Sequence, residues 1–151
     1  MARIADVMSL RLVSVRPDES VQLAISRMLE ENVGSVAVCD ESQRLVGIFT
    51  ERDVLRLAGE GAGWSDVRMA DVMTRRVLTV SPDDDIVAAA SLMGERRIRH
   101  VPVVEGENVL GIVGMRDVMR TLVERLFREQ DPQAREAARE LLQRAPSSTA
   151  S

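Results

Sequence analysis

Two related motifs hold the side chains best suited to contact a polar ligand. They are Gly47–Asp53 (GIFTERD) and Gly111–Asp117 (GIVGMRD), and each stands where a strand-like run passes into a helix-like one. The start of a helix offers unbonded backbone N–H groups and a partial positive charge, which suit a phosphate. Thr50 can donate a hydrogen bond from its hydroxyl, and the Asp53 carboxylate can accept from both hydroxyls of a ribose. Since Thr-x-x-Asp is also a capping pattern, helix capping and ligand binding both stay open for this pair.

The second motif departs from the first at one chemically important position. Gly114 stands where the first copy has Thr50, so the reciprocal cap is broken, whereas Asp117 keeps its place. An acidic residue in the first turn of a helix is worth about 0.3–1 kcal/mol by itself. We therefore expect the second site to bind differently, weakly or not at all. Arg52 and Arg116 precede the two aspartates, and they either add to a phosphate site or pair with local acids.

A basic cluster precedes one predicted strand of the second half of the chain. Arg97, Arg99 and His100 lie within the run Glu95–Pro102, and the corresponding stretch of the first half, Asn32–Ser35, carries no charge. The planar fork of arginine suits a phosphate bidentately, so the run predicts the phosphate end of a ligand site. A charge run is also typical of a solvated surface, and both interpretations stay open.

The composition and the remaining motifs exclude several classes of function. The chain has 151 residues with one cysteine, Cys39, and one histidine, too few for a Cys/His zinc cluster or a disulfide scaffold. Aromatic residues make up 2% and the formal net charge is −4, which argues against nucleic-acid binding. We find no nucleophile–base pair, Walker-type loop or metal cluster, and the acidic run Asp83–Asp85 fits helix N-terminal charge. We therefore expect neither an enzyme nor a metal site.

The chain also carries no pattern typical of membrane insertion or secretion. No apolar run approaches the roughly 20 residues of a membrane span. The N-terminal residues show no signal-peptide pattern. We therefore expect a cytoplasmic protein without membrane contact.

An internal duplication is the main organising feature of the sequence. Ala5–Met8 recurs 65 residues later as Ala70–Met73, with the same Ala-Asp-Val-Met letters. After one residue is lost in a turn the shift becomes 64, and Arg52–Val54 recurs as Arg116–Val118. Both halves should therefore share one small architecture.

Each half of the duplication reads as strand, helix, strand, strand, helix. In the first half we expect strands at 12–15, 35–39 and 45–49, helices after 17–20 and from Thr50 to about 58, and a helical turn at 4–7. In the second half we expect a first strand containing Leu78 and Thr79, and a hairpin at 100–104 and 109–113. The predicted units are residues 3–58 and 68–127, joined by a flexible linker at 59–67. An amphipathic C-terminal helix at 131–145 and a disordered tail at 146–151 follow.

These motifs, in this order and present twice, resemble a tandem pair of CBS domains, named after the regulatory region of cystathionine β-synthase. The resemblance covers about residues 3–127. It implies an α+β (α/β-like) fold in which the two repeats pack by their sheets about a pseudo-twofold axis. It also implies a non-catalytic regulatory module that binds AMP, ATP or S-adenosylmethionine in a cleft between the repeats, requires no cofactor, forms a homodimer and signals to an unidentified protein target. The alternative is a ligand-free dimerisation or scaffold protein that acts through its C-terminal helix.

The resemblance also assigns the ligand-binding positions. Residues of the first and second strands of each half would form an apolar slot for adenine: Val13, Ser14, Ser35, Val36, Ala37, Leu78, Thr79, Val101 and Pro102. The sugar and phosphate would contact the motif residues and the basic cluster: Thr50, Arg52, Asp53, Arg97, Arg99, His100, Gly114, Arg116 and Asp117.

Overall fold

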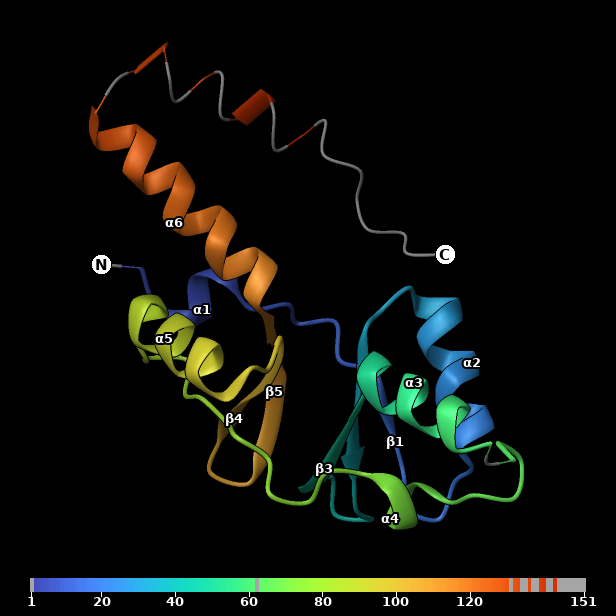
Figure 1. Ribbon diagram of the computed structural model, residues 1–151. Helices are drawn as coiled ribbons and strands as arrows, with labels where there is room; N and C mark the ends of the chain where they lie inside the picture. Colours follow the sequence, from blue (N-terminus) through green and yellow to red (C-terminus); the bar gives the residue numbers. More distant parts are fainter. Residues whose placement is uncertain are drawn as a thin grey trace.

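The computed structural model describes residues 2–61 and 63–130, together with 132, 133, 136, 139, 140 and 143. The helix expected at 131–145 lies mostly outside these described residues, and the tail expected at 146–151 lies wholly outside them. The described chain forms two repeats that stand side by side (Figure 1). The fold is the expected α+β arrangement of helices and small sheets.

The first repeat contains a three-stranded sheet with two helices against it. Its elements are α1 (Ile4–Val7), β1 (Ser14–Val15), α2 (Val21–Glu31), β2 (Ser35–Cys39), β3 (Leu45–Thr50) and α3 (Glu51–Glu60). Strand β1 pairs parallel with β2, and β2 pairs antiparallel with β3. Ser20 caps α2 by accepting a hydrogen bond from the backbone N–H of Leu23 at 3.1 Å, and the left-handed Asn32 ends it.

The second repeat has the same order of elements without the first strand, and its sheet is therefore smaller. Its elements are α4 (Met69–Val72), α5 (Ile86–Arg96), β4 (His100–Glu105), β5 (Asn108–Gly114) and α6 (Met115–Gln130). The prediction of a first strand at Leu78–Thr79 is wrong, because these two residues are not part of a strand. The chain pairs with β4 just after them, through a single parallel bridge between Val80 and Val103. In the first repeat the Ala37 N–H donates to the Val13 carbonyl at 3.0 Å.

The cause of this difference is a proline in the second repeat. Pro102 occupies the position that corresponds to Ala37, 65 residues later. It has no N–H to donate to the carbonyl of Leu78, which corresponds to Val13. The second repeat therefore keeps a two-stranded sheet, β4 with β5.

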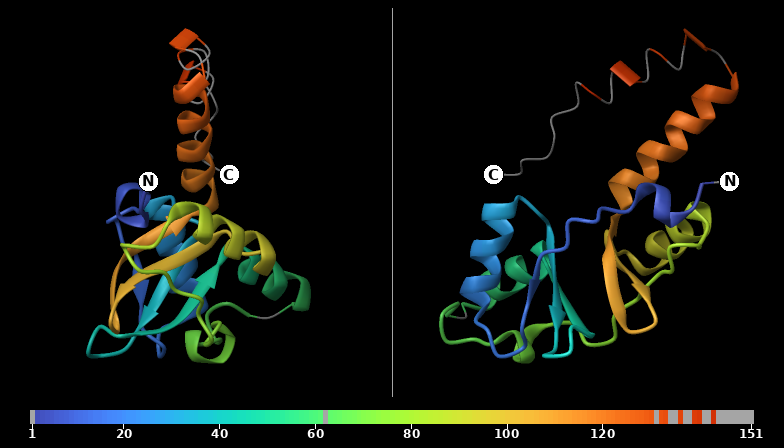
Figure 2. Two further views of the ribbon diagram at one scale, coloured as in Figure 1. Left: turned by 90° about the vertical axis from the view of Figure 1, so that its left-hand side faces the viewer. Right: turned by 180° about the vertical axis from the view of Figure 1, so that it is seen from behind.

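The short helices α1 and α4 are exchanged between the repeats. Ile4 of α1 is fully buried in the core of the second repeat, and Met69 of α4 is fully buried in the core of the first. Accordingly, α1 lies near α5 in one half of the molecule and α4 lies below the sheet of the other half (Figures 1 and 2). Backbone bonds hold each helix in place, from the Ile4 N–H to the Asp84 carbonyl and from the Met69 N–H to the Glu19 carbonyl, both at 2.9 Å.

Isolated bridges between the repeats obey the pseudo-twofold symmetry of the duplication. The Arg3–Asp85 bridge corresponds to the Arg68–Ser20 bridge when 65 is added to 3 and subtracted from 85. The Ser9–Ile112 bridge corresponds to the Thr74–Ile48 bridge when 65 is added to 9 and 64, the shift after the lost residue, is subtracted from 112. The segment between each exchanged helix and the following strand therefore crosses the partner repeat, and this ties the two repeats into one body.

Candidate functional site

A cleft of about 790 Å³ lies between the two repeats. One wall comes from the first repeat: Leu12, Val13, the C-terminal half of α2, the loop 32–35 and the first turn of α3. The opposite wall comes from the second repeat: Arg99, His100, Ile112, Gly114, Met115, Arg116 and Asp117. The wall is mainly apolar on the side of α2 and charged on the side of α6. This combination suits a ligand with an apolar ring and a polar or charged group.

The cleft brings together part of the predicted ligand-binding set. The predicted residues that line it are Val13, Ser35, Arg99, His100, Gly114, Arg116 and Asp117. Those that do not line it are Ser14, Val36, Ala37, Thr50, Arg52, Asp53, Leu78, Thr79, Arg97, Val101 and Pro102. Several of the second group, including Val36, Ala37 and Val101, are fully buried in the sheets.

Asp53 is engaged in capping the helix that it begins. One carboxylate oxygen, Oδ2, accepts from the Thr50 backbone N–H at 2.9 Å and from the Thr50 hydroxyl at 3.3 Å. The other oxygen, Oδ1, pairs with Arg56 at 3.4 Å. Asp53 is 8% exposed. The structure thus contains the capping arrangement that the Thr-x-x-Asp spacing allows.

Replacing Asp53 with alanine is expected to lower the free energy of unfolding by about 1–2 kcal/mol, because the first turn of α3 loses its cap. Urea unfolding followed by circular dichroism measures this change. Asp117→Ala, at the corresponding position of α6, is the matched control and should cost less than about 1 kcal/mol, the value of a helix-dipole interaction. Equal losses for the two variants would contradict the capping role of Asp53.

Asp117 has a different environment from Asp53, although the two residues correspond in the duplication. Its side chain is 45% exposed and borders the cleft. Gly114 offers no hydroxyl, and the nearest ion pair of Asp117 is a long one, 3.9 Å to Arg120. The carboxylate of Asp117 is therefore placed to accept hydrogen bonds from a ligand in the cleft.

His100 lies at the centre of the boundary between the repeats. It is paired with Gly114 across β4 and β5. A Cβ atom built on Gly34 of the first repeat would lie 3.0 Å from Cε1 of His100 and 3.1 Å from Oε1 of Glu51, so the imidazole packs closely against the backbone of residue 34. Burial lowers the pKa of His100, and the positive charge of Arg99 lowers it further. The negative charges of Glu51 and, more weakly, of Asp117 raise this pKa.

Beside the predicted Val13, the cleft is lined by Ser9, Arg11 and Leu12, which the sequence analysis missed. Ser9 forms two backbone hydrogen bonds with Ile112, at 2.8 and 3.0 Å, where the segment crosses β5. Arg11 lines the cleft and forms an ion pair with Glu31 at the end of α2. The sequence did contain an indication of this crossing. Gly111 lies within the predicted strand 109–113, and a glycine inside a strand often marks the close approach of another backbone.

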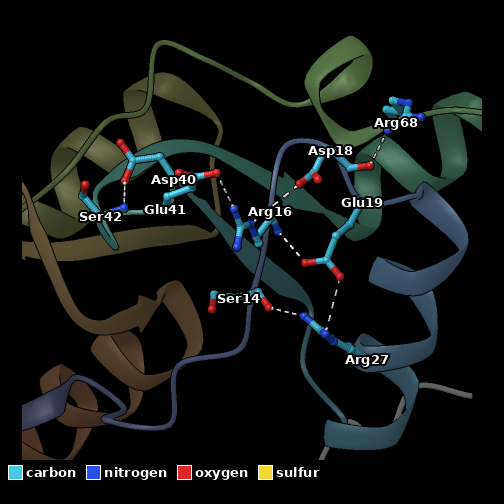
Figure 3. A network of polar contacts seen from close by, with 9 residues as sticks. All are labelled: Ser14, Arg16, Asp18, Glu19, Arg27, Asp40, Glu41, Ser42 and Arg68. Atoms are coloured by element: carbon cyan, nitrogen blue, oxygen red, sulfur yellow. Dashed lines mark hydrogen bonds and ion pairs between the residues drawn. The ribbon is translucent and has the colours of Figure 1, made fainter.

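The predicted adenine contact Ser14 belongs to a structural network instead of the cleft lining (Figure 3). Its carbonyl accepts a hydrogen bond from Arg27 at 2.7 Å. Glu19 pairs with Arg27 at 3.5 Å and accepts from the backbone N–H of Arg16 at 2.9 Å. At the edge of the same network, Arg68, just before α4, donates to the Asp18 carbonyl at 2.9 Å. These contacts join β1, the start of α2 and the start of α4.

A second, smaller cavity of about 360 Å³ lies where the two hairpins meet, and Thr79 lines it. Arg44 in its wall pairs with Asp40 at 3.0 Å and with Glu107 at 3.7 Å. A hydrogen bond from the backbone N–H of Arg44 lowers the pKa of Asp40. Because these charges neutralise one another, the cavity offers a less charged surface to a ligand than the larger cleft.

The described residues include no group of three or more His, Cys, Asp or Glu side chains placed to hold a metal ion. None of the helices in the described part of the chain combines the length and apolar character needed to cross a membrane.

Comparison with known proteins agrees with the duplicated fold. The CBS domain family model matches residues 4–60 and again residues 69–124. The chain belongs to the CBS-domain family. Each match includes one exchanged short helix and one strand-to-helix motif, so the chain is a tandem pair of CBS domains.

One curated relative of this CBS pair is arabinose 5-phosphate isomerase KdsD from Yersinia pestis. It is 35% identical over 122 residues, a stretch that covers 80% of this chain and 37% of the isomerase. The chain therefore spans little more than a third of that relative's length.

Solved structures of CBS pairs have the same fold. One is the CBS domain pair of protein MJ0100, solved with 5-methylthioadenosine and S-adenosyl-L-methionine. Its TM-score is 0.77 and its sequence identity is 25%, and the match covers 83% of this chain and 98% of the MJ0100 chain. Another is CBSX2 in complex with AMP, with a TM-score of 0.70 and 27% sequence identity. This match covers 82% of this chain and 98% of the CBSX2 chain. Both of these CBS pairs were thus solved with adenosyl ligands.

Proposed function

We propose that this CBS pair is a non-catalytic regulatory module that binds an adenosyl nucleotide in the 790 Å³ cleft between its domains. The observation that carries the proposal is the cleft itself, whose apolar wall near Val13 faces the carboxylate of Asp117. The carboxylate would accept from the ribose hydroxyls, and the apolar wall would cover the adenine. The complexes of MJ0100 and CBSX2 with adenosyl ligands support this choice of ligand class.

The same geometry supports a signalling role in which ligand binding changes the packing of the two domains. The lining comes from both CBS domains and from the segment Ser9–Val13 that connects α1 to β1. A ligand in the cleft therefore contacts parts that belong to different domains. Such a ligand shifts the relative packing of the domains by the difference in its affinity for the two arrangements.

Calorimetric titration with AMP, ATP and S-adenosylmethionine tests the proposal, and at least one of them should bind. Asp117→Asn is expected to weaken the binding about 10- to 100-fold, since a hydrogen bond to a charged group contributes roughly 1.5–3 kcal/mol. Asp53→Asn is the matched control, because Asp53 lies outside the cleft lining. Its affinity should stay within about twofold of the original protein while its stability falls.

Two results would contradict the proposed function. Absence of binding by all three ligands would favour the ligand-free scaffold instead. Turnover of any of the nucleotides in the same samples would contradict the non-catalytic assignment.

A further inference from the structure

We propose that the C-terminal segment 131–145 packs back along an exposed apolar face of α6 as an antiparallel helix and ends beside the cleft. The partner of this face is therefore a part of the same chain. The inference goes beyond the proposed function and does not depend on which ligand the cleft binds.

Helix α6 carries an apolar face that is largely exposed in the described part of the chain. Met119 is 48% exposed and Leu126 is 58% exposed. With the partly buried Val123 they recur at spacings of four and three residues, so the three side chains lie on one face of the helix. Leu122, by contrast, packs against the core of the second domain. An apolar helix face is normally covered by another apolar surface, and this one needs such a partner.

The end of this face lies beyond the body of the second domain. Helix α3 ends at Glu60, which corresponds to Glu124, whereas α6 continues to Gln130. The end of α6 accordingly stands away from both sheets (Figures 1 and 2). Leu126 belongs to this extension and is therefore out of reach of the two domain cores.

The chain turns just after α6. Asp131 and Pro132 are typical of the cap and the first residue of a new helix. Because a residue before proline disfavours helical backbone, α6 does not simply continue through Asp131. A short connection of this kind favours two helices that are antiparallel neighbours.

The segment that follows has one polar face and one apolar face. Four of its described residues are helical and exposed, and their spacing of three, four and three places them on one face: Gln133, Glu136, Glu140 and Gln143. The apolar residues of the segment fall on the opposite face of the same helix: Ala134, Ala137, Ala138, Leu141 and Leu142. This apolar face is the one that we expect to contact α6.

The lengths and the charges of the two helices match in an antiparallel arrangement. At roughly 1.5 Å per residue, a helix over 132–145 is about 21 Å long and the part of α6 from Met119 to Gln130 is about 18 Å long. The three alanines then face Leu126, and the two leucines reach Met119. Arg139 lies at the level of Glu124, so these flanking charges are opposite in sign.

The same arrangement brings the end of the segment to the cleft. Arg116 lines the cleft and lies three residues before Met119, on the same side of α6. The two leucines, which reach Met119, therefore lie at the edge of the cleft, close to the boundary between the domains.

Hydrogen exchange of the full chain, followed by mass spectrometry, tests the inference. The amides of residues 133–145 should exchange about tenfold or more slowly than those of an unfolded peptide, because a helix of this length is marginal unless it is packed. Leu126→Glu should remove this protection, since it places a charge against the apolar face of the segment. Leu142→Glu should have the same effect from the other side. Gln143→Glu is the matched control, because it adds the same charge on the exposed face and should leave the protection unchanged.

Three results would overturn the inference. The first is exchange of residues 133–145 at the rate of an unfolded peptide in the original protein. The second is protection that survives Leu126→Glu, which would place the segment away from α6. The third is a molar mass, by light scattering, that falls with Leu142→Glu and not with Gln143→Glu, which would assign the apolar residues to a second copy of the chain.

An internal control shows that each variant is folded. The amides of α2, in the other domain, should keep their slow exchange in every variant. Because none of these measurements involves a ligand, a failure here leaves the proposed function intact.

Discussion

Ile4→Ala is expected to lower the free energy of unfolding by about 2–5 kcal/mol, the usual cost of truncating a fully buried isoleucine. Ile4 has no exposed surface and packs in the core that holds Val80, Ile86 and Val113 of the second CBS domain. The substitution therefore leaves a cavity in the domain to which, by sequence order, α1 does not belong.

Urea unfolding with two probes measures this effect. One probe is far-ultraviolet circular dichroism, and the other is the fluorescence of Trp64, which packs against the core of the first domain. Because α1 connects the domains, both probes should report the same destabilisation. Leu55→Ala is the control, since Leu55 is 73% exposed on α3 and its truncation should change stability by less than about 0.5 kcal/mol. A loss below about 1 kcal/mol for Ile4→Ala would contradict the exchange of α1 between domains.

Gly111→Ala is expected to lower the free energy of unfolding by about 3 kcal/mol, near the upper end of the usual cost of overpacking. A Cβ at residue 111 would lie 2.3 Å from the carbonyl oxygen of Ser9, a backbone atom that is itself hydrogen bonded to Ile112. The segment 9–13 would have to move away from β5. Since this segment also lines the cleft, AMP binding should weaken as well.

Gly94→Ala provides a control with the opposite sign. No atom lies within 4 Å of a Cβ built on Gly94, which is in the interior of α5. Alanine there should raise the free energy of unfolding by about 0.5–1 kcal/mol, because it has the higher helix propensity. Thermal unfolding of both variants measures the two signs in one experiment. A neutral Gly111→Ala would mean that the segment 9–13 is not held against β5 as the structure shows.

The two halves of the duplication have diverged at the start of the helix that follows each strand-to-helix motif. In the first domain Thr50 and Asp53 satisfy each other, and the aspartate is nearly buried. In the second domain Gly114 removes the hydroxyl partner, and Asp117 faces the cleft. The absence of a capping hydroxyl weakened the expectation for the second site on the sequence alone. In the structure the same absence leaves the carboxylate of Asp117 uncapped at the cleft, where the proposed ligand would bind.

The sequence by itself determined the duplication, the order of elements and the residues of most helices and strands. Strand β2 at Ser35–Cys39 and helix α1 at Ile4–Val7 have the predicted bounds. The reason is that local signals suffice for them: alternating β-branched residues, helix-capping side chains and turn residues act within a few positions of the chain. The Leu78–Thr79 strand failed because its pairing depends on the N–H of a distant residue, and that residue is Pro102.

Only the tertiary structure decided which domain each short helix covers and which aspartate faces the cleft. The apolar pattern of Ile4–Val7 fits the core of either domain equally well, and the choice depends on the path of the segment 9–13 across β5. Likewise, Asp53 and Asp117 have the same spacing within their motifs. Their exposure differs because the carboxylate of Asp53 is held in the cap of its own helix, whereas that of Asp117 lies at the edge of the cleft between the domains.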